Sequence, residues 1–202
     1  MVQKDEVSYV SLNVDRPIWD EFFTVYPLVL VGTKEADGSY DLAPKHLAIP
    51  VSWENYFGFV CSETHGTYQN IKREGEFTVS YPRPTQAVLA SLAASPREDD
   101  ASKPIVGALP TNQAKQVDGL FLADSYLNLE CKLHQVIDGL GKNSLITGQI
   151  IAASIMAQAV RREEVDDVDI IRNLSLMAYL YPGRIAEITK TQKLPFPVNF
   201  RR

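Results

Sequence analysis

The chain has 202 residues, of which 45% are hydrophobic and 22% are charged, and its formal net charge at pH 7 is −5. This length suits one folded unit, so we expect a single domain over residues 1–202. The acidic balance argues against a nucleic-acid binder, which needs clustered Lys and Arg, but it permits a local pocket for one phosphate group.

The beginning of the chain and its apolar stretches argue against export and membrane insertion. Residues Met1–Glu6 are charged, with no apolar region behind them. The longest apolar stretch, residues 150–157, is interrupted by Ser154 and is far shorter than the roughly 20 residues that span a bilayer. We therefore expect a cytoplasmic protein with no membrane association. Cys61 and Cys131 lack partners at metal-ligand spacing, so we predict two buried free thiols and no metal site.

The first third of the chain has the pattern of antiparallel strands. Residues Tyr26–Thr33 are rich in β-branched and apolar side chains, and the turn signal Asp37–Gly38 predicts a hairpin with Tyr40–Ala43. Prolines bracket residues Lys45–Ile49, so this short extended piece belongs at a strand end or a sheet edge. The apolar run Tyr56–Cys61 predicts a buried strand.

A short helix is predicted next, over residues 68–74. Thr67 is the expected N-cap and Gly75 the expected C-terminal stop. Residues Glu76–Ser80 then alternate as a strand does, with Phe77 and Val79 on one face.

The rest of the chain continues the β pattern around one long excursion. We predict a helix over residues 84–94, an irregular excursion over residues 95–119, strands over 127–133, 145–152 and 184–189, and a solvated loop and helix start in the acidic run 163–169. Antiparallel strands outnumber helices and no βαβ rhythm is present. The fold class is therefore mainly β, a small β-barrel with appended helices.

Two polar clusters stand at predicted strand ends. The first, residues 43–48, offers the cation of Lys45 and the imidazole of His46. The second, residues 61–67, offers four side chains that can donate to an anion: Ser62, Thr64, His65 and Thr67. A helix starting at Thr67 adds free N–H groups and the positive end of a helix dipole. These residues either form an anion cradle or are ordinary turn and capping residues.

Several short motifs, in this order, resemble the flavin reductase-like family of the FMN-binding split-barrel fold. They are Gly32-Thr33, Asp37-Gly38, Leu42-Ala-Pro44, Ser62-Glu-Thr-His-Gly-Thr-Tyr-Gln-Asn-Ile71, Gly75-Glu-Phe-Thr-Val79, Leu129-Glu-Cys131 and Thr147-Gly-Gln149. The resemblance covers residues 27–152. It implies a split β-barrel, a homodimer whose interface helps to form the pockets, and FMN as the cofactor.

The resemblance places the FMN phosphate on the loop 62–67 and the flavin ring against residues 45–49. We therefore predict these flavin-binding residues: Lys45, His46, Leu47, Ala48, Cys61, Ser62, Thr64, His65, Thr67 and Asn70. Hydride transfer requires no side-chain acid or base, so no catalytic residue is predicted.

Three functions fit the sequence. The first is an NAD(P)H-dependent flavin reductase that passes electrons to a small-molecule acceptor or a partner flavoenzyme. The second is a flavoenzyme with its own organic substrate, for which the excursion 95–119 would supply a pocket wall. The third is a non-catalytic flavin carrier. The turn 141–144 favours the third, because it lacks the histidine that the family often has there.

Overall fold

The structure is a computed structural model and describes residues 7–197. Residues Met1–Glu6, on which the prediction about export rests, lie outside the described residues, as do residues 198–202 of the predicted domain.

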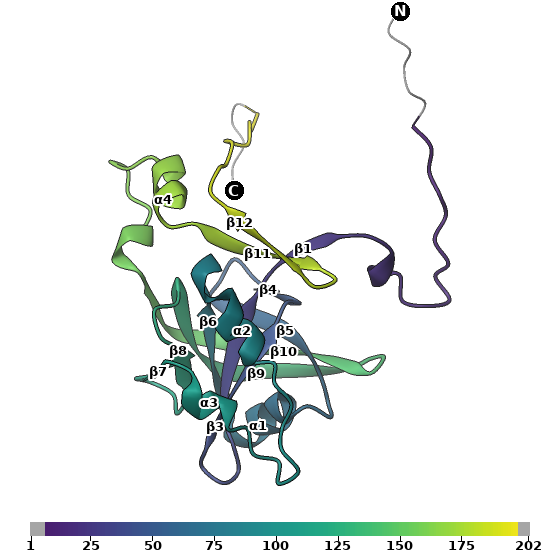
Figure 1. Cartoon of the computed structure of the whole chain (residues 1–202), viewed down its shortest axis with the longest axis vertical. Helices are drawn as coiled ribbons and strands as arrows, with labels where there is room; N and C mark the ends of the chain where they lie inside the picture. Colours follow the sequence, from purple (N-terminus) through teal and green to yellow (C-terminus); the bar gives the residue numbers. More distant parts are fainter. Residues whose placement is uncertain (1–6, 198–202) are drawn as a thin grey trace, which may run out of the picture.

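A seven-stranded antiparallel sheet forms the body of the protein (Figure 1), with the strand order β3-β2-β6-β9-β10-β5-β4. Its strands are β2 (Val29–Lys34), β3 (Tyr40–Lys45), β4 (Ala48–Pro50), β5 (Tyr56–Ser62), β6 (Glu76–Tyr81), β9 (Leu127–Leu140) and β10 (Asn143–Ile155). The two edge strands, β3 and β4, are joined by residues 46–47 alone. The sheet must therefore curl until its edges meet, which makes it a half-open barrel.

In the described residues, two smaller sheets and four helices surround this barrel. The three-stranded sheet contains β1 (Thr24–Pro27), β11 (Leu176–Tyr181) and β12 (Arg184–Ile188), and the two-stranded sheet contains β7 (Thr111–Gln113) and β8 (Leu120–Leu122). The helices are α1 (Gly66–Glu74), α2 (Ala87–Leu92), α3 (Ile105–Ala108) and α4 (Asp167–Asn173). Short 3₁₀ turns lie at Trp19–Glu21, Pro84–Gln86 and Ala157–Ala159.

Strand β2 separates two apolar clusters, which explains why both of its faces are apolar. Val29 and Val31 face the barrel interior together with Phe57, Phe59 and Phe77. Leu30 faces the opposite way, into a second cluster with residues of α2, α3 and β8. Fully burying one such aliphatic side chain is worth about 1.5–3 kcal/mol, so this strand is a major stabilising element. The predicted fold class, mainly β with appended helices, is confirmed.

Most predicted elements are confirmed, with two corrections. The predicted strand 26–33 is two strands, because the chain leaves one sheet and enters another at Leu28. Thr67 is not the N-cap of α1. The helix begins one residue before it, at Gly66, and His65 occupies the capping position with extended backbone angles. Gly75 ends the helix as predicted, with a left-handed φ of 72°.

The remaining predictions differ from the structure mainly in length. The helix predicted over 84–94 is a 3₁₀ turn followed by α2, and the excursion 95–119 contains α3 and β7. The acidic run 163–169 is the loop and helix start that we predicted, with Asp166 accepting a hydrogen bond from the Val168 N–H at 2.8 Å. Within residues 7–197, no helix combines the length and apolarity needed to cross a bilayer.

Candidate functional site

The first turn of helix α1 presents backbone donors that no described group uses. The N–H groups of Tyr68 and Gln69 donate to the carbonyl of His65. Among residues 7–197, the N–H groups of Gly66 and Thr67 and the hydroxyl of Thr67 have no hydrogen-bond acceptor. His65 makes no side-chain capping bond either. This end of the helix is therefore open to an anion, which the helix dipole favours.

Three cationic side chains converge on this helix end from two segments of the chain. Lys45 comes from the end of β3, and Arg97 and Lys103 come from the excursion that follows α2. No hydrogen bond or ion pair within residues 7–197 engages the ammonium of Lys45. Burial and the nearby Lys103 lower the pKa of Lys45, whereas Cys61 and Asp41 oppose this shift. An anion in the site would relieve this unfavourable burial of charge.

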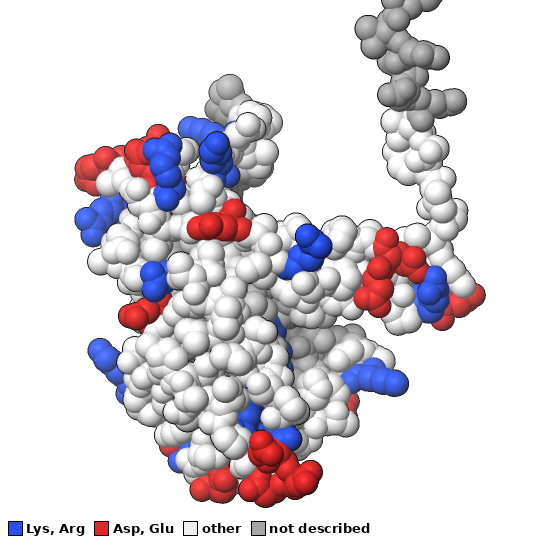
Figure 2. Space-filling model, viewed as in Figure 1, with Lys and Arg blue, Asp and Glu red and all other residues white. Residues whose placement is uncertain are grey.

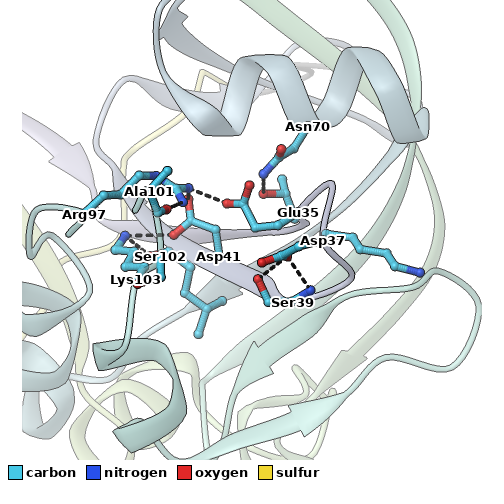
Figure 3. Close-up of polar contacts among 12 residues, drawn as sticks. Glu35, Asp37, Ser39, Asp41, Asn70, Arg97, Ala101, Ser102 and Lys103 are labelled. Atoms are coloured by element: carbon cyan, nitrogen blue, oxygen red, sulfur yellow. Dashed lines mark hydrogen bonds and ion pairs between the residues drawn. The ribbon is translucent and has the colours of Figure 1, made fainter. Parts of the chain in front are cut away.

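Arg97 and Lys103 are held in place by carboxylates on the β2–β3 hairpin (Figure 3). Lys103 Nζ donates to Asp41 Oδ1 at 2.8 Å and to the carbonyl of Leu42 at 2.9 Å. Arg97 donates to Glu35, to Asp41 Oδ2 at 3.2 Å and to the carbonyl of Ala101 at 2.8 Å. The three cations thus face two carboxylates, Glu35 and Asp41, which leaves one positive charge in excess beside the helix end.

A cavity of about 430 Å³ lies between these groups, and it contains four of the ten predicted residues: Lys45, Thr64, His65 and Thr67. The Thr64 hydroxyl is paired with the Ser62 hydroxyl at 3.0 Å. Burial, together with the charge of Lys45, lowers the pKa of His65. The imidazole is therefore neutral around pH 7, and it can donate one hydrogen bond but adds no charge.

Three of the other predicted residues are buried in the protein instead. Ala48 and Cys61 belong to the apolar core of the barrel. Cys61 Sγ lies 3.9 Å from His65 Nδ1, and burial raises the pKa of the thiol. Asn70 joins α1 to β2, because its side-chain amide donates to Thr33 Oγ1 at 3.0 Å. These three residues therefore pack beneath the cavity and do not line it.

His46 lies in an aromatic cluster on the other side of the β3–β4 connection. Its ring centroid is 5.6 Å from that of Tyr26, 5.0 Å from that of Tyr179 and 5.2 Å from that of Tyr181. Burial and then Lys45 lower its pKa. The next residue, Leu47, is exposed. The chain therefore turns at His46 between the cationic cavity and this aromatic cluster.

Arg97, Lys103, Asp41 and Glu35 are functional candidates that sequence reasoning missed. The carboxylates lie about sixty residues before the cations, since the Arg97–Glu35 and Lys103–Asp41 pairs each span 62 residues. In the sequence, Arg97 and Lys103 are two of the three cations of the excursion, and nothing in their spacing singles them out. Figure 2 shows acidic and basic side chains side by side at the lower end of the molecule, where the β2–β3 hairpin lies in Figure 1.

The chain resembles known proteins over most of its length. The family model described as "Flavin reductase like domain" matches residues 23–179. Among solved structures, the 2-nitrobenzoate 2-nitroreductase of Pseudomonas fluorescens is similar with a TM-score of 0.78 at 18% identity, covering 96% of this chain and 99% of that one.

Two further solved structures share the fold. Nitrilotriacetate monooxygenase component B of Bacillus cereus has a TM-score of 0.79 at 14% identity, covering 94% of this chain and 100% of that one. Flavoredoxin of Methanosarcina acetivorans has a TM-score of 0.74 at 16% identity, with coverages of 96% and 97%. At these identities the structures show a common split-barrel fold. The family model, which spans most of the chain, shows that this protein belongs to the flavin reductase-like family.

Proposed function

We propose that this protein binds FMN and is an NAD(P)H-dependent flavin oxidoreductase. The observation that carries the proposal is the cationic cavity at the start of α1. Backbone donors, the Thr67 hydroxyl and the Lys45 ammonium, none of which has a partner among residues 7–197, all lie there in a member of the flavin reductase-like family.

The phosphate of FMN is the group that this cavity suits. A phosphate monoester carries nearly two negative charges at pH 7 and three acceptor oxygens. The N–H groups of Gly66 and Thr67 and the Thr67 hydroxyl match these oxygens, and Lys45 supplies a charge that no described residue neutralises. Arg97 adds a guanidinium beside Gly66 at the same helix end. Such charge-assisted hydrogen bonds are the strong ones in proteins.

The flavin ring belongs beside the β3–β4 connection. Among residues 7–197, the backbone N–H groups of His46 and Leu47 donate to no acceptor, whereas that of Ala48 donates to the carbonyl of His46 at 2.9 Å. Two free N–H groups at a sheet edge can bind the carbonyl oxygens of the pyrimidine ring. Leu47 and Ile49 are exposed here and offer an apolar surface to a flat aromatic ring.

Flavin supplies the redox chemistry when it is bound, by accepting a hydride from NAD(P)H and returning two electrons to an acceptor. The residues of this chain bind and orient it. Lys45 and Thr67 hold the phosphate end, and His46 and Leu47 hold the ring end. The acceptor we propose is a small molecule or a partner flavoenzyme.

We also propose a homodimer of one-domain chains in the cytoplasm. The strip next to the site contains four exposed apolar side chains, and Trp53 is 98% exposed. The strip consists of Leu47, Ile49, Val51 and Trp53. Exposed apolar side chains that follow one another along an edge strand and its loop are typical of a protein–protein contact. A second chain over this strip would also cover the exposed face of a bound flavin ring.

A flavoenzyme that reduces its own organic substrate is the second candidate. One observation favours it: the excursion 95–119 contributes Arg97 and Lys103 to the cavity wall, as expected if this segment selects a substrate. The similar Pseudomonas fluorescens structure is described as a 2-nitroreductase, and a nitroaromatic carboxylate would suit a cationic wall.

An absorption spectrum of the purified protein tests the proposal, first with added FMN and then after anaerobic addition of NADH or NADPH. We expect protein-bound oxidised flavin whose visible bands bleach with the reductant. Reduced flavin that is reoxidised only after an organic substrate is added, with continued consumption of NADH or NADPH, would favour the second candidate. Bound flavin that stays oxidised with both reductants would favour a carrier, and no binding would refute all three functions.

A further inference from the structure

An apolar cavity lies at the junction of the three-stranded sheet and the barrel. Its volume is about 420 Å³, within the roughly 300–1,000 Å³ that is typical of small-molecule sites in proteins. Strands β1, β11 and β12, which lie above the barrel in Figure 1, contribute to its lining, and so do Tyr81 at the end of β6 and Leu127 at the start of β9. It shares no lining residue with the cationic cavity, so the two are separate spaces.

The lining of this apolar cavity disfavours charged ligands. The described residues that form it include no Asp, Glu, Lys, Arg or His. The hydroxyl of Ser175, which also belongs to the lining, already donates to Glu187 at 2.6 Å. A carboxylate or a phosphate would lose its hydration here without gaining a cation, which is strongly unfavourable. The cavity therefore suits a neutral ligand whose surface is mainly apolar.

Tyr81 contributes an unsatisfied hydrogen-bond donor to the lining. Its ring packs against the core of the barrel, with its centroid 6.4 Å from that of Phe57. Burial raises the pKa of its hydroxyl to about 12. Within residues 7–197 no acceptor engages this hydroxyl, although a buried tyrosine hydroxyl usually has a partner.

The Tyr81 hydroxyl is nevertheless open to a small molecule. Among the described side chains, the unpartnered polar atoms that are closed off from solvent are Thr24 Oγ1 and Asn128 Oδ1, and the oxygen of Tyr81 is not one of them. The protein thus removes most of the water around this donor and still leaves it accessible. An acceptor atom of a ligand in the cavity would satisfy it.

The lining also favours an aromatic ligand over an aliphatic one. Tyr26 and Tyr126 belong to it, and their hydroxyls have no partner in the described part of the chain. The ring of Tyr26 is held from outside the cavity by His46, at a centroid distance of 5.6 Å. Aromatic side chains pack well against a flat ring, and a phenol hydroxyl donates readily to a carbonyl oxygen. A plain hydrocarbon would fill the space but leave the Tyr81 donor unpaired.

We propose that this cavity binds a neutral aromatic compound with a carbonyl group, which accepts a hydrogen bond from the Tyr81 hydroxyl. Aryl ketones are the simplest members of this class. The site goes beyond the proposed function, because it needs no bound flavin and its uncharged lining does not suit the phosphate of FMN.

Two probes of nearly equal shape test the proposal: acetylnaphthalene, which has a carbonyl group, and ethylnaphthalene, which has none. Equilibrium dialysis against the purified protein measures their dissociation constants with and without saturating FMN. We expect saturable one-to-one binding of acetylnaphthalene. FMN should change its dissociation constant by no more than about twofold, since the two ligands occupy separate cavities.

Tyr81→Phe isolates the hydrogen bond. The substitution keeps the ring and breaks no hydrogen bond within the described chain, so the fold should persist. We expect the affinity for acetylnaphthalene to fall about three- to tenfold and that for ethylnaphthalene to stay within about twofold. Tyr56→Phe is the matched control, because Tyr56 is another half-buried tyrosine and does not line this cavity. It should change neither constant.

Three results would overturn the inference. They are the absence of saturable binding, a Tyr81→Phe variant that leaves acetylnaphthalene unchanged or weakens both probes equally, and displacement of acetylnaphthalene by FMN. The last would place the probe on the proposed flavin site. The absorption spectrum with added FMN tests the proposed function separately, so either proposal can fail while the other stands.

Discussion

The guanidinium of Arg97 lies directly against Gly66, the first residue of α1: a Cβ added to Gly66 would come within 2.7 Å of Arg97 Nη2. A cation at the positive end of a helix is unfavourable by itself. Glu35 and Asp41 compensate for it by pairing with Arg97. This arrangement keeps a positive charge at a helix end whose first N–H groups have no acceptor in the described part of the chain, and both features favour an anion there.

Gly66→Ala should weaken FMN binding while leaving the fold intact. The added methyl group displaces the Arg97 guanidinium from the helix end, and Ala is a better helix former than Gly, so the stability of α1 should not fall. We expect the affinity for FMN to fall about three- to tenfold, because one partly screened contact between Arg97 and the phosphate is lost. The affinity for riboflavin, which has no phosphate, should not change. Titration of both ligands measures this. A parallel loss for riboflavin would mean that Arg97 does not act on the phosphate.

The affinity for FMN should fall at alkaline pH because of Lys45. Burial lowers its pKa from the ordinary value of 10.5. The charged ammonium attracts the phosphate, so affinity is full below the lowered pKa and falls as the pH rises through it. Lys45→Arg should abolish this fall, because guanidinium stays charged. Lys45→Met should bind weakly at every pH. An affinity profile of the wild type that stays flat up to pH 10.5 would contradict this role.

Asp41→Asn should destabilise the protein strongly. The carboxylate is nearly buried and pairs with both Arg97 and Lys103, and the side chains of Asp41 and Lys103 are only 5% and 8% exposed. Breaking such a buried pair leaves an uncompensated charge and costs about 3–5 kcal/mol of unfolding free energy.

Asp169→Asn is the matched control for this change, since the exposed Asp169–Arg172 pair on α4 should contribute no more than about 1 kcal/mol. Urea unfolding of both variants gives the comparison. Equal effects of the two substitutions would show that Asp41 does not hold the excursion in place.

The sequence predicted the local half of the site and missed the non-local half. The loop 62–67 follows a strand and precedes a helix within a few residues, so its polar side chains could be grouped from their spacing as a candidate anion cradle, with ordinary turn and capping residues as the alternative. Arg97 and Lys103 reach the same place only because the 95–104 segment crosses over β3. That crossing depends on the packing of α2 and α3 against Leu42, which no local pattern encodes.

The same contrast holds for the fold. Strands such as β6 are evident from alternation, because Phe77 and Val79 face one core. The aromatic cluster around His46 joins β1 to β11, whose residues are about 150 positions apart in the chain, as the pairing of Tyr26 with Tyr179 shows. The sequence around His46 could therefore suggest that this residue lies near a ligand. It could not predict that three tyrosines from distant segments surround its ring.

Ile49→Glu should prevent dimer formation if the apolar strip is the contact between chains. Ile49 is 54% exposed on the edge strand β4. A charge placed in an apolar contact loses solvation without gaining a partner, so the dimer should dissociate. Val88→Glu, at an exposed apolar residue of α2, should leave the mass unchanged. Sedimentation velocity measures both variants, and a monomeric wild type would refute the proposed dimer.

The central claim is that the phosphate of FMN binds at the start of α1, and Thr67→Val tests it most directly. Val keeps the shape of the buried Thr67 but removes the hydroxyl that has no partner among the described residues. Losing a hydrogen bond to a charged group costs about 1.5–3 kcal/mol, roughly ten- to a hundredfold in affinity. Calorimetric titration should show that loss for FMN and none for riboflavin, with Thr111→Val on strand β7, outside this cavity, as the control. Equal weakening of FMN and riboflavin, or no change in either, would place the phosphate elsewhere and contradict the account.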